Sequence, residues 1–199
     1  MSLRTSYTII APFYDLVVRG FSQELRKRSL ARAALGTGQS VLLPGIGTGL
    51  DLPHLPIGPH YTGIDLTPAM LQRAQQQIPE GLNIELQTAD AMALPFEDNH
   101  FDCVIMHLIL AVVPQPQRAL AEAARVVKPG GRILILDKFL RPGEGAWLKR
   151  AISPLLGRIA TRTDVVFEEL LATLPQLQVN YNEAAGLGGW FRHIELNKL

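Results

Sequence analysis

Five short apolar or β-branched segments alternate with stretches of helical character along the first two thirds of the chain. They are SVLL (40–43), YTGI (61–64), NIEL (83–86), FDCVIM (101–106) and RILIL (132–136). Between them, Thr67 and Pro68 begin one predicted helix, and the residues Lys128 to Gly131 end another. Because strands that alternate with helices form parallel sheets, we predict an α/β fold with a doubly wound, mostly parallel sheet.

The pattern changes after Asp137. The stretch GEGAWLKRAISPLLGRIATRTD is typical of an irregular helix interrupted by Pro154, and LQVNYNE and WFRHIEL are predicted to pair as a C-terminal antiparallel hairpin. The hairpin brings the expected sheet to seven strands. Since 199 residues with 47% hydrophobic content bury one core, we expect a single domain over 1–199. The N-terminal helix 1–35 and the 144–162 helix are its expected lid elements.

Composition weighs against several classes of function. The net charge is +1, so no global field draws the chain to nucleic acid, and we expect no nucleic-acid partner. The only cysteine, Cys103, lies in an apolar run and is expected to fill the core of a protein from a reducing compartment. The five histidines lack metal-ligand spacing, which predicts no metal site. Without a signal peptide or a membrane-length apolar run, we expect a cytoplasmic protein.

Three glycines follow the first predicted strand at alternate positions, in the stretch VLLPGIGTGLDLPHLP. Gly45, Gly47 and Gly49 can adopt positive φ and let the backbone approach a ligand closely. Asp65 ends the second strand, twenty residues after Gly45 (65 − 45), and this spacing places a carboxylate at both hydroxyls of a ribose. The pattern predicts an unphosphorylated nucleoside, because a 2′-phosphate would be repelled.

The same stretch weighs against NAD. Leu50 stands where the dinucleotide fingerprint needs glycine or alanine for close helix packing. Pro53 and Pro56 also keep the following helix short, which weakens a pyrophosphate site at its N-terminus. An NAD oxidoreductase therefore stays only an alternative.

A further acidic residue, Asp90, follows the third predicted strand in LQTADAMALPF. Its carboxylate can accept the adenine amino group, while Ala91 and Met92 offer a backbone N–H and an apolar wall. Taken alone, Asp90 is more typical of a turn residue or a cap, but its place in series with the glycines and Asp65 favours the adenine contact.

Between Tyr7 and Asp137 the chain resembles the class I S-adenosylmethionine-dependent methyltransferases. The resemblance rests on YTIIAPFYD, VLLPGIGTG, GIDLTPAML, TADAMALPFEDNHFD and RVVKPGGRILIL, in that order. Through GTGLDLPHLP, ILAVVPQPQRAL and ISPLLGRI it is similar to the bacterial phosphatidylethanolamine N-methyltransferases and related quinone C-methyltransferases. The resemblance implies an enzyme that uses S-adenosylmethionine.

The resemblance also implies roles for individual residues. The three glycines face the methionine part of the cofactor, Asp65 binds its ribose, and Leu66 is a further contact. Met70 packs on the adenine, and Asp90 with Ala91 reads the adenine edge. Two residues are candidate catalytic groups: Tyr14 closes over the cofactor, and His107 lies beside the transferred methyl.

The chemistry leaves the role of His107 open. A neutral amine or carbanion acceptor must lose a proton, and the imidazole is the best-placed general base because its intrinsic pKa lies near neutrality. The alternative is a histidine that lines the pocket or satisfies a strand-end hydrogen bond. Tyr7 and Tyr14 likewise either hold a cation over a ring face or pack in the N-terminal helix.

One position departs from the family. Leu43 stands two residues before the first glycine, where the resemblance leads us to expect an acidic residue that engages the methionine amino group. Its loss would weaken cofactor binding by about 1–3 kcal/mol if the contact is charge-assisted. A non-catalytic S-adenosylmethionine-binding protein is therefore an alternative.

Charge placement bears on the acceptor. Residues 141–162 carry five basic residues and one acidic residue, and Leu148, Ile152, Leu155 and Ile159 recur at helical spacing. This predicts a basic amphipathic helix that contacts an anionic membrane, peripherally and on its inner face. The alternative is a helix that packs on the domain. We predict a small apolar or lipid-like acceptor, either a phospholipid amine or a quinone precursor, with a soluble small-molecule substrate as the alternative.

Overall fold

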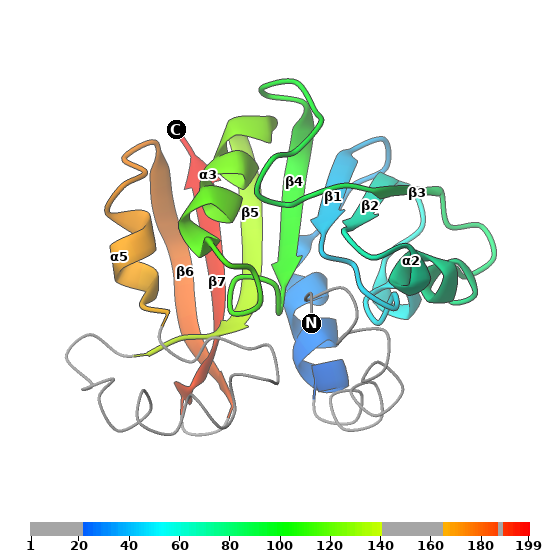
Figure 1. The fold of residues 1–199 in the computed structure, drawn as a ribbon, viewed down its shortest axis with the longest axis horizontal. Coiled ribbons are helices and arrows are strands. Elements are labelled where there is room, and N and C mark those ends of the chain that lie inside the picture. Colours follow the sequence, from blue (N-terminus) through cyan, green and yellow to red (C-terminus); the bar gives the residue numbers. More distant parts are fainter. Residues whose placement is uncertain (1–21, 141–164, 187–188) are drawn as a thin grey trace.

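A seven-stranded sheet organises the computed structural model, which describes residues 22–140, 165–186 and 189–199 (Figure 1). The strand order is β3-β2-β1-β4-β5-β7-β6. Strands β1 to β5 pair in parallel, whereas β7 runs antiparallel to both β5 and β6. The strands are β1 (Ser40–Pro44), β2 (His60–Asp65), β3 (Ile84–Thr88), β4 (Phe101–His107), β5 (Val127–Lys138), β6 (Leu177–Gly186) and β7 (Phe191–Lys198). The predicted doubly wound sheet and its terminal hairpin are confirmed.

Both faces of the sheet are covered. Leu42 and Leu43 are neighbours in β1 and belong to two separate buried clusters, because successive side chains of a strand point to opposite faces. The cluster of Leu42 contains side chains from α3 (Pro116–Val126) and α5 (Phe167–Leu171). The cluster of Leu43 contains side chains from α2 (Pro68–Gln75) and from the helical segment 22–33. Parallel sheets are ordinarily buried on both faces in this way.

The helical segment 22–33 packs as part of the core. Leu25, Leu30 and Ala33 are buried, and Nε2 of His193 in β7 lies 3.0 Å from the carbonyl oxygen of Leu25. In Figure 1 this blue segment lies at the lower edge of the sheet, to which the β4 arrow points. The remainder of the predicted N-terminal lid, with Tyr7 and Tyr14, and the 144–162 helix lie outside the described residues.

Prolines shape the elements that follow the glycine turn and β2. The helix after the turn, η1 (Leu52–His54), is a single 3-10 turn, short as expected: Pro53 lies in its first turn, and Leu55, which precedes Pro56, is extended and ends it. Thr67 and Pro68 begin α2 at the predicted position, although the Thr67 side chain makes no capping hydrogen bond. Its backbone N–H instead donates to Oδ1 of Asp65 at 2.9 Å, which links the start of α2 to the end of β2.

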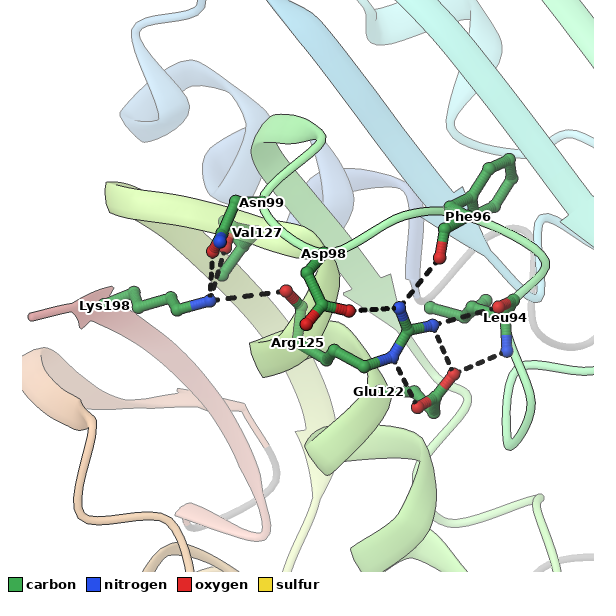
Figure 2. A network of polar contacts seen from close by, with 8 residues as sticks. All are labelled: Leu94, Phe96, Asp98, Asn99, Glu122, Arg125, Val127 and Lys198. Carbon is green, nitrogen blue, oxygen red and sulfur yellow. Dashed lines mark hydrogen bonds and ion pairs between the residues drawn. The ribbon is translucent and has the colours of Figure 1, made fainter.

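The partly exposed guanidinium of Arg125 holds the long loop between β3 and β4 (Figure 2). The guanidinium of Arg125, at the end of α3, donates to the carboxylates of Glu122 and Asp98 at 2.8–2.9 Å. It also donates to the carbonyl oxygens of Phe96 and Leu94 at 2.7 and 3.0 Å. Because a guanidinium offers five donors in a rigid fork, one side chain can fix several points of a loop. The loop that begins near Asp90 is thereby tied to α3.

Candidate functional site

A cavity opens at the carboxyl ends of the parallel strands, where the strand order reverses between β1 and β4. This is the place where open α/β sheets bind their ligands. The cavity brings together the glycine turn and the residues that follow β2, β3 and β4, as the sequence predicts. Its wall is formed by Arg26, Gly45, Ile46, Gly47, Thr48, Leu50, Asp65, Leu66, Thr67, Met70, Ala89, Asp90, Ala91, Met92, His107, Leu108, Ile109, Val112, Val113 and Pro114.

The three glycines of the turn have different roles. All adopt positive φ, of 69° at Gly45, 57° at Gly47 and 85° at Gly49. A Cβ atom on Gly45 would lie 2.3 Å from Cδ1 of Ile109, and one on Gly49 would lie 3.0 Å from Cα of Ala74. A Cβ atom on Gly47 would meet only a carbonyl oxygen at 3.9 Å. Gly45 and Gly47 line the cavity, whereas Gly49 packs against α2 and does not belong to the cavity wall.

Asp65 connects the glycine turn to α2. Its Oδ2 accepts the Gly47 N–H at 3.0 Å, and its Oδ1 accepts the Thr67 N–H at 2.9 Å. Burial raises the pKa of this carboxyl, and the two N–H donors oppose the rise. Since each carboxylate oxygen has two acceptor sites, the carboxylate retains capacity for further donors from the cavity.

Apolar and turn residues also line the cavity. Leu66 is 43% exposed and Met70 is buried, and both belong to the cavity wall. Oδ1 of Asp90 accepts the Met92 N–H at 2.8 Å, so Asp90 forms a local turn as well as lining the cavity beside Ala91. The two interpretations of Asp90 are therefore compatible.

His107 is buried at the end of β4 with both ring nitrogens in hydrogen bonds. Nδ1 lies 2.7 Å from Oδ1 of Asp51, and Nε2 lies 2.9 Å from Oγ of Ser29. A carboxylate only accepts, so Nδ1 carries the hydrogen, and Nε2 of the neutral ring accepts from the Ser29 hydroxyl. The ring also lines the cavity. Its predicted role as a base stays a prediction.

Asp51 is the centre of this buried network. Its second oxygen, Oδ2, accepts a hydrogen bond from Nη1 of Arg26, which forms an ion pair. Burial disfavours the charged carboxylate, but the positive charge of Arg26 and the hydrogen bonds from Arg26 and His107 hold the pKa of Asp51 well below its usual range. The network joins the helical segment 22–33 to the glycine turn and to β4.

Sequence reasoning missed Arg26, Asp51 and Ser29. Arg26 is one of six basic residues in the first 35, and nothing in their spacing distinguishes it. Asp51 carries a weak signal, because it follows the glycine turn directly in GTGLDLP. Its partners are 25 and 56 positions away, which no local pattern can reveal.

The chain after β4 is held in a strained turn beside the cavity. Leu108 adopts φ of 57°, an uncommon conformation for leucine, and its N–H donates to the carbonyl oxygen of Leu136 at 2.7 Å. Oδ2 of Asp137 accepts the Ala111 N–H at 3.2 Å. Burial raises the pKa of Asp137 to about 6, against the opposing effect of the Lys138 and Ala111 N–H groups. The turn places Ile109 in the cavity wall.

Leu43, the departure noted in the sequence, does not face the cavity. It is 1% exposed and belongs to the buried cluster that includes Ile46, Leu52 and Ile105. Within the described ranges no group of three or more metal-ligating side chains comes together. Fold and site together define an α/β protein that binds a nucleoside-like ligand across the carboxyl ends of its central strands.

Comparison with known proteins gives the family. The methyltransferase domain family matches residues 42–135. A phosphatidylethanolamine N-methyltransferase of Cereibacter sphaeroides is 33% identical over 189 residues, which are 93% of this chain and 92% of that protein. A demethylmenaquinone methyltransferase of Tropheryma whipplei (strain Twist) is 32% identical over 182 residues, which are 86% of this chain and 75% of that protein.

A solved structure shows the same fold. It is the complex between the Haloferax volcanii Trm112 methyltransferase activator and a putative methyltransferase, with a TM-score of 0.79 at 18% identity, over 100% of this chain and 99% of that one. The chain belongs to the class I S-adenosylmethionine-dependent methyltransferases. It is an enzyme of that class with S-adenosylmethionine as its cofactor, which confirms the predicted family and sets aside the NAD oxidoreductase.

Proposed function

We propose that this methyltransferase acts on a small apolar or lipid-like acceptor, either a phospholipid amine or a quinone precursor. The observation that carries the proposal is the apolar part of the cavity wall after β4, formed by Ile109, Val112, Val113 and Pro114. The named activities of the relatives support it, because phosphatidylethanolamine and demethylmenaquinone are both membrane lipids.

The cavity residues fit the cofactor from end to end. The Asp65 carboxylate is partly desolvated and is suited to accept hydrogen bonds from the ribose hydroxyls, as the sequence predicts. Leu66, Met70 and Ala91 offer apolar surfaces to the adenine, with Asp90 at its edge. The open space over Gly47 leaves room for the methionine part beside the backbone.

The residues of this chain supply position rather than covalent chemistry. When bound, the cofactor would supply a methyl group activated by a positively charged sulfur, so that a bond from the acceptor's lone pair to the methyl carbon forms as the carbon–sulfur bond breaks and the neutral thioether leaves. The walls around Ile109 and Val112 exclude water and hold the acceptor in line, and alignment of that kind accounts for much of the rate. For a protonated or acidic acceptor, Nε2 of His107 receives the proton only if the acceptor replaces the Ser29 hydroxyl at that nitrogen.

A methyl-transfer assay with labelled S-adenosylmethionine tests the acceptor class. The panel comprises phosphatidylethanolamine vesicles, a demethylated quinone in detergent, and soluble amines of similar size. We expect transfer to one of the two lipid classes and little to the soluble amines. Transfer confined to soluble amines contradicts the proposal, and cofactor binding without any transfer supports a non-catalytic binding protein instead.

We also propose that the protein meets its acceptor at an anionic membrane surface, through the basic segment 141–162. In the ranges that the structure describes, no helix is long and apolar enough to cross a bilayer. The surplus of basic residues in this segment supports a peripheral contact, because anionic lipid attracts each of them. A soluble substrate needs no such contact.

A further inference from the structure

Arg26 is a buried cation on the wall of the cofactor cavity. Its side chain is only 9% exposed, yet it lines the cavity together with the glycine turn. Nη1 donates to Asp51, and Nε lies 3.4 Å from Oγ of Ser22. Within the described part of the chain, Nη2 of Arg26 donates to no acceptor. A guanidinium has two donors on that nitrogen, so Arg26 retains capacity for an acceptor from the cavity.

Asp51 and His107 fix the position of this guanidinium. Asp51 accepts from Arg26 with one oxygen and from His107 with the other, and both partners are buried. The His107 ring is held in turn by Ser29 at 2.9 Å. A guanidinium fixed in this way loses little side-chain entropy when it binds an anion, and its planar fork matches a carboxylate.

The charged residues of the cavity wall come from different elements. The carboxylates of Asp65 and Asp90 follow β2 and β3, whereas Arg26 is linked through Asp51 to His107 at the end of β4. The glycine turn lies beside the cation, and the position of Leu43 supplies no charge because that side chain is buried in the core. The part of the cavity wall at Arg26 is therefore suited to an anion.

We infer that Arg26 binds the carboxylate at the methionine end of the cofactor, and that Asp51 and His107 act as positioning residues for its guanidinium. The chain thus recognises the amino-acid group of the cofactor through a cation on its N-terminal helical segment. This assignment needs only the cofactor and rests on no particular acceptor.

Two ligands that differ only in the amino-acid group test the inference by calorimetry. S-adenosylhomocysteine carries the carboxylate, whereas 5′-methylthioadenosine has the same adenosine and thioether without it. In Arg26→Gln we expect S-adenosylhomocysteine to bind about 10- to 100-fold more weakly and methylthioadenosine to bind unchanged. Arg26→Lys keeps the charge but loses the fork, and we expect an intermediate loss for S-adenosylhomocysteine alone.

Controls separate contact from folding. Arg28→Gln alters an exposed arginine of the same helical segment, paired with Glu24 at 3.0 Å, and should change neither affinity. If Arg26→Gln does not fold, the wild type is titrated with decarboxylated S-adenosylhomocysteine, which should bind at least 10-fold more weakly than the parent compound. Equal losses of both ligands in a folded Arg26 variant, or equal affinity of the wild type for the decarboxylated and parent compounds, overturn the inference.

Discussion

His107 and Asp51 are 56 positions apart in the chain, yet Nδ1 of the imidazole lies 2.7 Å from Oδ1 of the carboxylate, and both side chains are shielded from solvent. The carboxylate also pairs with Arg26, so one acidic group neutralises a buried cation and orients a buried ring. A charged group in such a place is tolerated only while its partners are present. This makes the network sensitive to the loss of any one member.

Asp51→Asn should therefore destabilise the fold. The substitution removes the charge that pairs with Arg26, and removal of one member of a buried ion pair costs about 3–5 kcal/mol. Urea unfolding at pH 7 measures the loss. The matched control is Glu24→Gln, which removes one member of the exposed pair with Arg28 and should change stability by less than about 1 kcal/mol. Similar losses in both variants contradict a special role for the buried pair.

Asp65→Ala should weaken the binding of S-adenosylhomocysteine by about 1.5 to 3 kcal/mol, because the ribose hydroxyls lose a charged acceptor. Calorimetry measures this change directly. Glu80→Ala, which removes an exposed carboxylate outside the cavity wall, serves as the control. An unchanged affinity in the Asp65 variant would remove this residue from the binding site.

Leu43→Glu should lower the free energy of unfolding by several kcal/mol. Leu43 is 1% exposed in the core, and a carboxylate there would be buried among apolar neighbours such as Ile46 and Ile105. Leu43→Met keeps the volume and should cost less than about 1.5 kcal/mol. Thermal unfolding of the two variants gives the comparison. If the glutamate variant is as stable as the methionine variant and binds cofactor more tightly, the position is open to the ligand after all.

The features that local chemistry determines could be predicted from the sequence. The β-branched and apolar runs become strands because each side chain fills a face of the sheet, and the order Thr67-Pro68 places the start of α2. Asp65 could be assigned to the cavity because the turn, the strand and their spacing are contiguous in the chain. The same logic of strand ends predicts Asp90, whereas Leu66 is implied only by the family resemblance.

What could not be predicted depends on contacts between distant segments. Arg26 and His107 reach Asp51 only after the helical segment 22–33 has packed on the sheet, so no window of sequence contains the network. The sequence predicts that Gly49 faces the ligand. A glycine beside a ligand and a glycine beside a packed helix cannot be told apart in the sequence, and here Ala74 of α2 lies next to Gly49. Only the packed structure separates the two.

Asp137 should make stability depend on pH between about 4 and 6. Burial raises its pKa in the folded state to about 6, from 3.8, so the protonated form is the one that the fold favours. The resulting stabilisation is fully present below pH 3.8 and is lost as the pH rises to 6, by about 2–3 kcal/mol. The asparagine of the Asp137→Asn variant cannot titrate, so this variant should lack the pH-dependent stabilisation.

The measurement is urea unfolding of both proteins at intervals from pH 4 to 7. The other carboxyls titrate alike in the two proteins, so the difference between them isolates Asp137. We expect the wild type to lose stability relative to Asp137→Asn as the pH rises. If the free energies of unfolding of the two proteins depend on pH in parallel over the whole range, the pKa of Asp137 is not raised in the folded state.

The basic segment 141–162 distinguishes a lipid enzyme from one with a soluble substrate. If it binds membranes, binding to vesicles should require anionic lipid, at about 1 kcal/mol per basic residue near the surface, and should weaken as salt shortens the screening length. Reversal of Lys149, Arg150 and Arg158 to glutamate should then abolish vesicle binding and lower turnover of a membrane-embedded acceptor.

Turnover of a short-chain soluble analogue should survive this triple reversal, because the cavity residues that follow β1, β2 and β3 are unchanged. The matched control reverses Arg28, Arg73 and Arg118, which gives the same change in net charge outside the segment and should leave vesicle binding intact. Co-sedimentation with vesicles and initial rates on both acceptors provide the readouts. A wild-type protein that ignores anionic vesicles at low salt, or a triple variant that loses activity on both acceptors alike, contradicts the membrane proposal. In the second case the charge of the segment would affect turnover of the soluble acceptor without any membrane.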